Sequence, residues 1–139
     1  MKRILVGLDG SPAREHVLRA AVELALKLGG KLVLLRAVTI PIDVPMGAFS
    51  VSPDAVGSLL IDAARQDLER LAKTVPAALM DGIDVTLGVP WRTLVERAKA
   101  DGADLLVIGS HGYGGLDRLL GTTSAKVVNH AGCSVLVIR

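Results

Sequence analysis

Residues 104–123 read DLLVIGSHGYGGLDRLLGTT and combine the signals of a strand, a glycine-rich loop and a helix start. The apolar run Leu105–Ile108 is typical of a buried strand. The glycines that follow it let another group approach the main chain, and Thr122 and Thr123 suit the N-terminus of a helix. Exposed N–H groups and hydroxyls at such a point favour a phosphate ligand. The alternative is a βα loop that needs its glycines only to turn.

The composition predicts one α/β domain that does not bind nucleic acid. A chain of 139 residues is long enough to bury a proper core. Half of the residues are apolar, yet the chain has only one Phe, one Trp and one Tyr, so aliphatic side chains must build the core, as in buried parallel sheets. The net charge of +2 is small and the charges are scattered, which argues against electrostatic binding of nucleic acid.

The sequence also predicts a cytoplasmic protein without a membrane partner. The apolar run Ile4–Leu8 stops at Asp9 and is too short for the apolar region of a signal peptide. No apolar stretch approaches the length of a transmembrane span. Cys133 is the single cysteine, so the sequence holds neither a disulfide framework nor a cysteine-rich metal site.

Apolar periodicity alternates along the chain between strand-like and helix-like segments. We expect Ser11 to cap the first helix with Pro12 at its first position, and Ser52-Pro53 to open the second. Residues 39–51 contain prolines and no period, which is typical of a long loop. The second helix is expected to bury a face made of Leu59, Leu60, Ala63, Ala64, Leu68, Leu71 and Ala72. The predicted strands are residues 3–9, 31–38, 83–88, 105–108 and 134–138, and the predicted helices are 12–28, 53 to near 76, 90–101 and about 123–130.

Strands that alternate with helices predict right-handed βαβ units, and therefore a doubly wound parallel sheet covered on both faces. Ligands of such open sheets lie outside the carboxyl ends of the strands, where the winding direction reverses. Two predicted strands end in polar, glycine-bearing turns, Asp9–Ser11 and Gly109–Gly112. If these strands are neighbours, the two turns face each other across that crevice. Asp9 then either contacts the ligand or only braces its turn.

The chain resembles the universal stress protein family along essentially its whole length. The matching segments are ILVGLDGS at residues 4–11, GVP at 88–90, DLLVIGSHG at 104–112 and RLLGTTSAKVVNHAGCSVLVIR at 118–139. The resemblance implies a single domain over residues 1–139. It also implies a three-layer α/β fold with a five-stranded, doubly wound parallel sheet of order 3-2-1-4-5, the adenine nucleotide alpha hydrolase-like arrangement.

The nucleotide-binding branch of that family carries Gly, two residues, Gly, nine residues, and then Gly followed by Ser or Thr. This sequence has Gly109, Gly112 and Gly121-Thr122, with eight residues in the second interval. The resemblance implies a regulatory protein of the stress response that binds ATP or a related adenine nucleotide, with Mg²⁺. Ala37 and Val38 would line the adenine. The full set of implied ligand contacts is Asp9, Ser11, Ala37, Val38, Gly109, Ser110, Gly112, Gly121, Thr122 and Thr123.

The shortened glycine interval leaves a second class of function open. A protein that keeps this fold but has lost the nucleotide would act through interaction or chaperone-like contacts. Efficient catalysis is not expected, because no nucleophile is placed beside His111, the histidine of the candidate site. Slow ATP hydrolysis, or autophosphorylation on a Ser or Thr near Gly121, is the enzymatic alternative.

The predicted strand Ser134–Ile138 carries apolar side chains on both faces, and the implied strand order puts it at an edge of the sheet. Proteins normally protect such an edge with proline, charge or a covering element. Arg139 is the only charge at this edge, and it follows the strand. We therefore expect a homodimer in which two copies of the strand pair antiparallel across a two-fold axis, besides an unknown protein partner.

Overall fold

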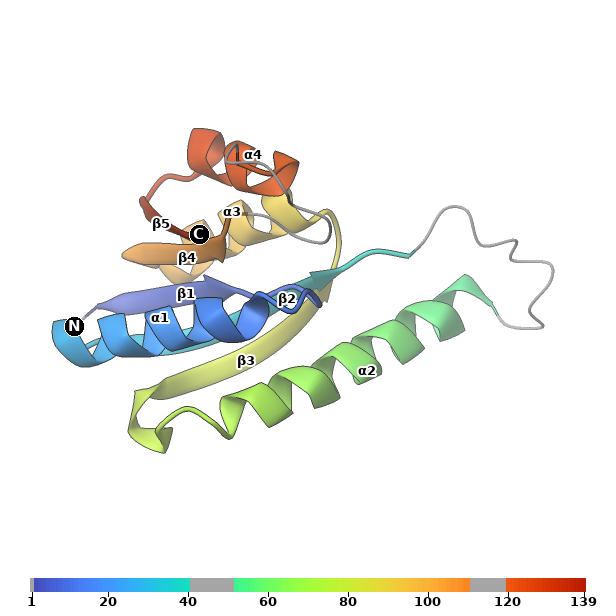
Figure 1. Ribbon diagram of the computed structural model, residues 1–139. Coiled ribbons are helices and arrows are strands. Elements are labelled where there is room, and N and C mark those ends of the chain that lie inside the picture. Colours follow the sequence, from blue (N-terminus) through green and yellow to red (C-terminus); the bar gives the residue numbers. More distant parts are fainter. Residues whose placement is uncertain (1, 41–51, 111–119) are drawn as a thin grey trace.

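The computed structural model describes residues 2–40, 52–110 and 120–139, which form a parallel sheet between two layers of helices (Figure 1). The strand order is β3-β2-β1-β4-β5, and the neighbouring strands are parallel. This confirms the predicted doubly wound fold and its strand order. The elements are β1 (Arg3–Gly7), α1 (Arg14–Leu28), β2 (Lys31–Val38), α2 (Pro53–Ala72), the short 3-10 helix η2 (Ala77–Leu79), β3 (Met80–Leu87), α3 (Pro90–Asp101), β4 (Leu105–Gly109), α4 (Thr122–His130) and β5 (Ser134–Ile138).

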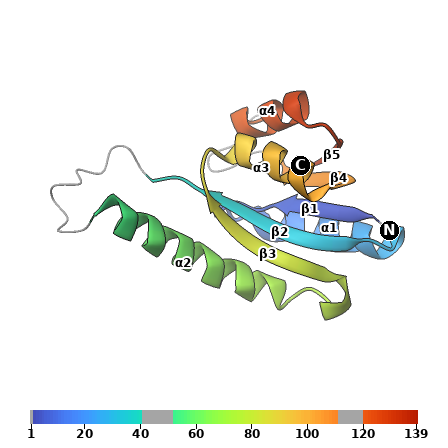
Figure 2. The same cartoon turned by 180° about the vertical axis from the view of Figure 1, so that it is seen from behind.

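The sheet is buried on both faces, which explains the aliphatic composition. Helices α1 and α2 cover one face, and α3 and α4 cover the other, as the front and back views show (Figures 1 and 2). The central strand β1 supplies Ile4 and Val6 to the first face and Leu5 to the second, because side chains alternate along a strand. The carboxyl ends of β1 and β4 therefore lie between two packed layers.

The first helix begins later than predicted. α1 starts at Arg14 with Ala13 as its N-cap and has no side-chain cap hydrogen bond. The prediction that Ser11 caps this helix and Pro12 starts it is therefore wrong. The physical reason is a separate turn before the helix: the Ser11 amide donates to Asp9 Oδ1 at 2.8 Å, and the Arg14 amide donates to Ser11 O at 3.2 Å.

The second helix begins as predicted, and its predicted inner face is confirmed in part, because Ala64, Leu68 and Leu71 are buried and Ala72 packs against the core. Ser52 Oγ accepts a hydrogen bond from the Ala55 amide, and Pro53 is the first helical residue. The inward placement of Leu59 and Ala63 is wrong, since Leu59 is 64% exposed and Ala63 is exposed too. The first turns of α2 extend beyond the sheet (Figure 1), and the buried side follows one helical stripe. That stripe consists of Gly57, Ala64, Leu68 and Leu71.

Parts of two predicted loops lie outside the described residues. These are most of the loop at 39–51, and residues 111–119 with His111 and Gly112. Among the described helices, none combines the length and apolar character needed to cross a membrane.

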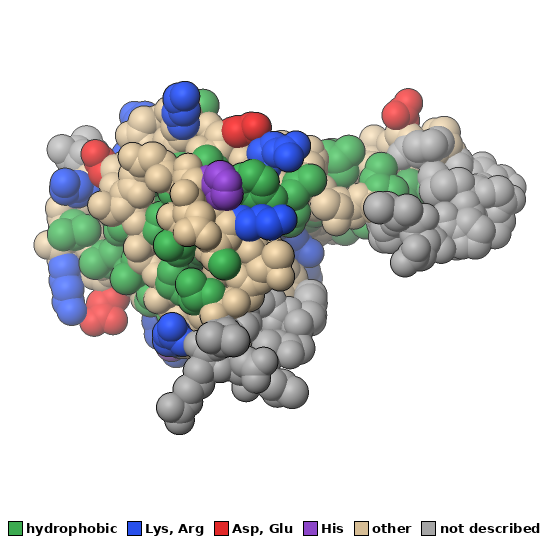
Figure 3. All heavy atoms as spheres, turned by 90° about the horizontal axis from the view of Figure 1, so that it is seen from above, with side chains coloured by type: hydrophobic (Ala, Val, Ile, Leu, Met, Phe, Trp, Pro, Cys, Tyr) green, Lys and Arg blue, Asp and Glu red, His purple; other side chains and the backbone are tan. Residues whose placement is uncertain are grey.

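The outer surface of α3 and α4 is built around Trp91, the single tryptophan of the chain. Its ring centroid lies 4.8 Å from that of His130 on α4. Arg92 and Lys126 place their cationic groups 5.4 and 5.7 Å from the same ring, within the range of cation–π attraction. Seen from above, basic and hydrophobic side chains lie on one side of a histidine on this face, and an acidic side chain lies close by (Figure 3). Trp91 thus joins the start of α3 to α4.

Gly7 at the end of β1 is required by the close approach of α3. A Cβ at this position would lie 2.7 Å from Leu94 Cδ2 and 3.2 Å from Ile108 Cγ2. We expect Gly7→Ala to lower the free energy of unfolding by about 1–3 kcal/mol, because Leu94 must leave its place. Chemical denaturation measures this, with Gly82→Ala on β3 as the control, since a Cβ there meets nothing within 4 Å. An equal loss in both variants would contradict the packing explanation.

Candidate functional site

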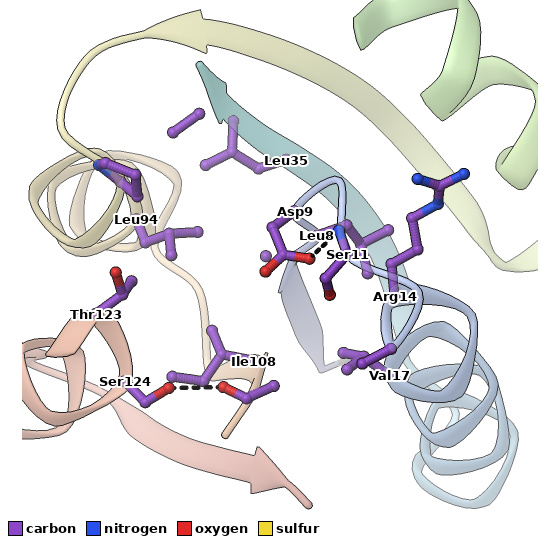
Figure 4. Close-up of a pocket in the computed structure, with 15 residues that line it drawn as sticks. Leu8, Asp9, Ser11, Arg14, Val17, Leu35, Leu94, Ile108, Thr123 and Ser124 are labelled. Atoms are coloured by element: carbon purple, nitrogen blue, oxygen red, sulfur yellow. Dashed lines mark hydrogen bonds between the residues drawn. The ribbon is translucent and has the colours of Figure 1, made fainter. Parts of the chain in front are cut away.

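A pocket of about 200 Å³ lies at the carboxyl ends of β1 and β4, where the direction of winding reverses (Figure 4). Open α/β sheets bind their ligands at this position. The lining comes from the end of β1 with the start of α1, from β2, from the start of α3, and from the end of β4 with the start of α4. The lining residues are Gly7, Leu8, Asp9, Ser11, Ala13, Arg14, Val17, Leu35, Ala37, Pro90, Leu94, Ile108, Gly109, Thr123 and Ser124.

The pocket brings together predicted contacts that are far apart in the sequence. The predicted residues that line it are Asp9, Ser11, Ala37, Gly109 and Thr123. Those that lie elsewhere in the described chain are Val38, Ser110, Gly121 and Thr122, and Gly112 lies outside the described residues. The reasons for this division differ from element to element.

Alternation along β2 separates Ala37 from Val38. Leu35 and Ala37 line the pocket, whereas Val38 packs against the core under α1 and α2. Val38 O also accepts a hydrogen bond from the Gly88 amide at 2.9 Å. Successive side chains of a strand point to opposite faces, so Ala37 and Val38 do not line the same pocket.

The turn between β1 and α1 presents Asp9 to the pocket. Asp9 Oδ1 accepts the Ser11 amide at 2.8 Å, so the carboxylate braces the turn. Asp9 is exposed and projects into the space between the starts of α1 and α4 (Figure 4). Bracing the turn and facing a ligand are therefore compatible roles for this side chain.

Two buried polar atoms beside the pocket, Ser11 Oγ and Arg14 Nε, have no hydrogen-bond partner within the described part of the chain. Ser11 is 2% exposed, and both residues line the pocket. An unpaired buried polar group costs about 1–3 kcal/mol, and native structures hold few of them. A ligand with hydrogen-bonding groups in the pocket would remove this penalty.

Arg14 ties the turn to α2. Its Nη1 donates to Gly10 O at 3.3 Å and its Nη2 to Asp67 Oδ1 at 3.0 Å. Asp67 also accepts Arg36 Nη1 at 3.1 Å and Arg70 Nη2 at 3.3 Å, so one carboxylate gathers several guanidinium groups. Arg14 was not among the predicted site residues, because its acidic partner is 53 residues away and no local pattern joins them.

The start of α4 is fixed against the end of β4 by hydrogen bonds. The Ser124 hydroxyl donates to Gly109 O at 2.7 Å and to Ser110 O at 2.8 Å. The Gly121 amide donates to Ser110 O at 2.8 Å, and the Ser110 amide to Ile138 O at 2.8 Å. Ser110 and Gly121 therefore hold the frame of the site, while Ser124, which the sequence analysis missed as a pocket residue, lines it. A hydroxyl in the first turn of a predicted helix was the available signal.

The polar side chains of the described pocket are hydroxyls, one carboxylate and one guanidinium group. Its lining offers hydroxyls and the carboxylate of Asp9, but neither a histidine nor a thiol. The described residues contain no group of three or more His, Cys, Asp or Glu side chains that could hold a metal ion. Cys133 is half-buried, and burial raises the pKa of its thiol, which makes it a poor nucleophile at neutral pH.

An open parallel sheet of this order, with a pocket at its switch point, defines a doubly wound α/β protein. Residues 1–139 match the model of the universal stress protein family. The chain belongs to the universal stress protein family, which confirms the resemblance seen in its sequence.

Similar proteins match over nearly the full length of the chain. A universal stress protein of Synechocystis is 32% identical over 99% of this chain and 97% of its own length. The solved structure of universal stress protein UspA from Lactobacillus plantarum is 31% identical, with a TM-score of 0.74 over 99% of this chain and 97% of that one. A universal stress protein crystallised in complex with cAMP is 27% identical, with a TM-score of 0.71 over 99% of this chain and 96% of that one.

Proposed function

We propose that the pocket binds an adenine nucleotide and that the protein acts as a nucleotide-responsive regulatory module of the stress response. The observation that carries this proposal is the buried Ser11 hydroxyl, which lines the pocket without a hydrogen-bond partner in the described chain. The relative crystallised with cAMP supports an adenine nucleotide as the class of ligand.

The apolar part of the pocket suits the base. Leu35 and Ala37 line it from β2, and Leu94 lines it from α3. A flat base gains free energy when it is buried against aliphatic carbon, and the small side chain of Ala37 leaves room for it. The volume of about 200 Å³ is below the ~300–1,000 Å³ of sites that enclose a whole ligand, so the base and sugar would fill the pocket and the phosphates would extend beyond it.

The charges around the pocket orient the nucleotide. The carboxylate of Asp9 repels phosphate at one end, whereas the N-terminus of α4 attracts it at the other. Lys126 in α4 and Arg92 in α3 lie beside the Trp91 ring, outside the lining of the pocket, and neither pairs with an acidic residue in the described chain. The phosphates would therefore lie at the start of α4, near Gly121 and Thr123.

Magnesium would arrive with the phosphates, because Mg²⁺ in nucleotide sites is usually held by one or two carboxylates, water and the phosphates themselves. Because Asp9, the carboxylate of the described lining, lies at the other end of the pocket, the phosphates and water would hold this ion. We propose ATP with Mg²⁺ as the ligand and a change of shape or partners as its effect. Slow ATP hydrolysis or autophosphorylation near Gly121 remains the enzymatic alternative, because hydroxyl groups follow this residue directly.

Ser11→Ala separates ligand binding from folding. The hydroxyl has no described partner in the protein, so its removal should leave the free energy of unfolding equal or slightly higher. If the hydroxyl bonds the ligand, the affinity should fall about tenfold from a micromolar value. Calorimetry with ATP and Mg²⁺, AMP and cAMP measures the affinity, and urea denaturation measures the stability. Absence of binding by the parent protein at millimolar nucleotide would favour the interaction or chaperone-like function.

We further propose that residues 1–139 act as one domain, in the cytoplasm, as a homodimer that also meets an unidentified protein partner. The dimer would form through β5, an edge strand on which Leu136 is 37% exposed. Within the described chain, no side chain hydrogen-bonds to the backbone of Ser134–Ile138. Such an edge offers its outward N–H and C=O groups to a second copy.

A further inference from the structure

The opposite edge of the sheet is closed by side chains. β3 lies at this edge, and among the described strands it pairs only with β2. The Gly88 amide donates to Val38 O of β2 at 2.9 Å. Along a parallel strand, every second residue directs its N–H group toward the same neighbouring strand. The Val85 amide, three residues earlier, therefore points away from β2 and toward the open edge.

The side chain of Asp84 accepts a hydrogen bond from that outward amide. Asp84 Oδ1 accepts a hydrogen bond from Val85 N at 2.9 Å. An additional strand at this edge would need the same N–H group for its own hydrogen-bond ladder. The carboxylate of the preceding residue therefore competes directly with an incoming strand.

Arginines from both faces of the sheet meet at this carboxylate. Arg65 of α2 lies 3.8 Å from Asp84 Oδ1, measured from its Nη2, and Arg97 of α3 hydrogen-bonds to Asp84 Oδ2. Helices α2 and α3 cover opposite faces of the sheet (Figures 1 and 2). The ion pairs of Asp84 therefore join side chains from both faces at the edge of β3. We call Arg65, Asp84 and Arg97 the Asp84 clamp.

The clamp is held in place from the α3 side. Arg97 Nε also hydrogen-bonds to Asp101 at 3.0 Å, so its guanidinium bridges two carboxylates. The hydrogen bond to Asp84 is the main cause that raises the pKa of Arg97, which keeps this side chain charged. β5, in contrast, has no side chain of the described residues bonded across its backbone.

We propose that the Asp84 clamp prevents a second copy of this chain from pairing with β3 and so restricts self-association to the β5 edge. Unprotected strand edges are templates for pairing with another chain, and charged side chains placed on an edge block that pairing. A molecule with two open edges could bind a neighbour at each, and such contacts continue from copy to copy unless they close. The clamp makes a closed assembly possible, and this role is independent of nucleotide binding.

The test exchanges the residue at the edge in a background of Arg65→Gln, so that Arg65 does not remain as an unpaired cation. Arg97 keeps Asp101 as its partner in this background. Asp84→Val removes the carboxylate and adds a side chain that favours strands. Asp84→Lys removes the same ion pairs but restores a charge that blocks edges. Light scattering over a range of concentrations measures the molar mass, and thermal melts followed by circular dichroism confirm that each variant is folded.

We expect the Asp84→Val variant to associate with rising concentration, to at least about twice the molar mass of its parent, because its second edge is open. The Asp84→Lys variant should keep the molar mass of the parent, although it has lost the same hydrogen bonds. A folded Asp84→Val variant with the parent's molar mass at all concentrations would overturn the proposal. Equal association of the Lys variant would overturn it too, because the cause would then be the lost ion pairs and not the open edge.

Discussion

Replacing Ala37 by Phe should lower the affinity for adenine nucleotides by at least about 100-fold, or about 2.7 kcal/mol. Ala37 lines the pocket from β2, and a phenyl ring at this position would fill the space of about 200 Å³ that we assign to the base and sugar. The fold should persist, because the ring enters an existing pocket and adds buried apolar area there. Calorimetry with ATP, AMP and cAMP measures the affinity, and urea denaturation the free energy of unfolding.

Thr39→Phe is the matched control for this variant. Thr39 is exposed, lies two residues further along the chain and does not line the pocket. The same ring placed there should leave the affinity within about twofold of the parent, because it does not reach the base. If the folded Ala37→Phe variant binds ATP as tightly as the parent protein, the nucleotide lies elsewhere and the proposed site is wrong.

Val137→Pro should convert the proposed homodimer into monomers. Ile138 O accepts the Ser110 amide from the end of β4, so the groups of Ile138 face inward and those of Val137 face the outer edge. Proline at 137 would therefore remove a donor needed by a second copy without breaking the ladder to β4. Light scattering at roughly tens of micromolar, above the dissociation constant of a stable dimer, measures the change in molar mass.

Val137→Ala is the control. It also removes the packing of the valine side chain, but it keeps the outward N–H group. Val137 packs on the core under α3 and α4, so both variants should lose some stability. Only the proline variant should lose the dimer. A parent protein that is monomeric under these conditions would refute the homodimer, and a dimeric Val137→Pro variant would move its interface away from β5.

Much of the fold was readable from signals that lie within single elements. Aliphatic runs ended by polar turns predicted the strands, and Pro53, Pro90 and Gly102 marked helix ends where the structure has them. Gly29 and Gly102 both adopt positive φ, of 68° and 62°, which glycine tolerates best. Such signals depend only on residues that are near one another in the sequence, so they can be recognised without the tertiary structure. The family resemblance added the strand order, which local patterns do not contain.

The site was only partly accessible in this way. Side chains alternate between the two faces along β2, so Ala37 and Val38 cannot both line one pocket. The exclusion of Val38 could therefore have been predicted from the sequence. The separate turn before α1, in which the Ser11 amide donates to Asp9 Oδ1, places the Ser11 hydroxyl in the pocket and not at the helix cap. In the sequence, a serine before an apolar helical period is equally consistent with a helix cap and with a turn that precedes the helix.

Contacts between distant residues were decided by the tertiary structure alone. Arg14 meets Asp67 across 53 residues, and Asp84 meets arginines from helices on opposite faces of the sheet. Each of these side chains taken singly is an ordinary surface charge in the sequence. Their partners are set by which strand pairs with which and by how each helix lies on the sheet, and those arrangements result from packing the whole core at once.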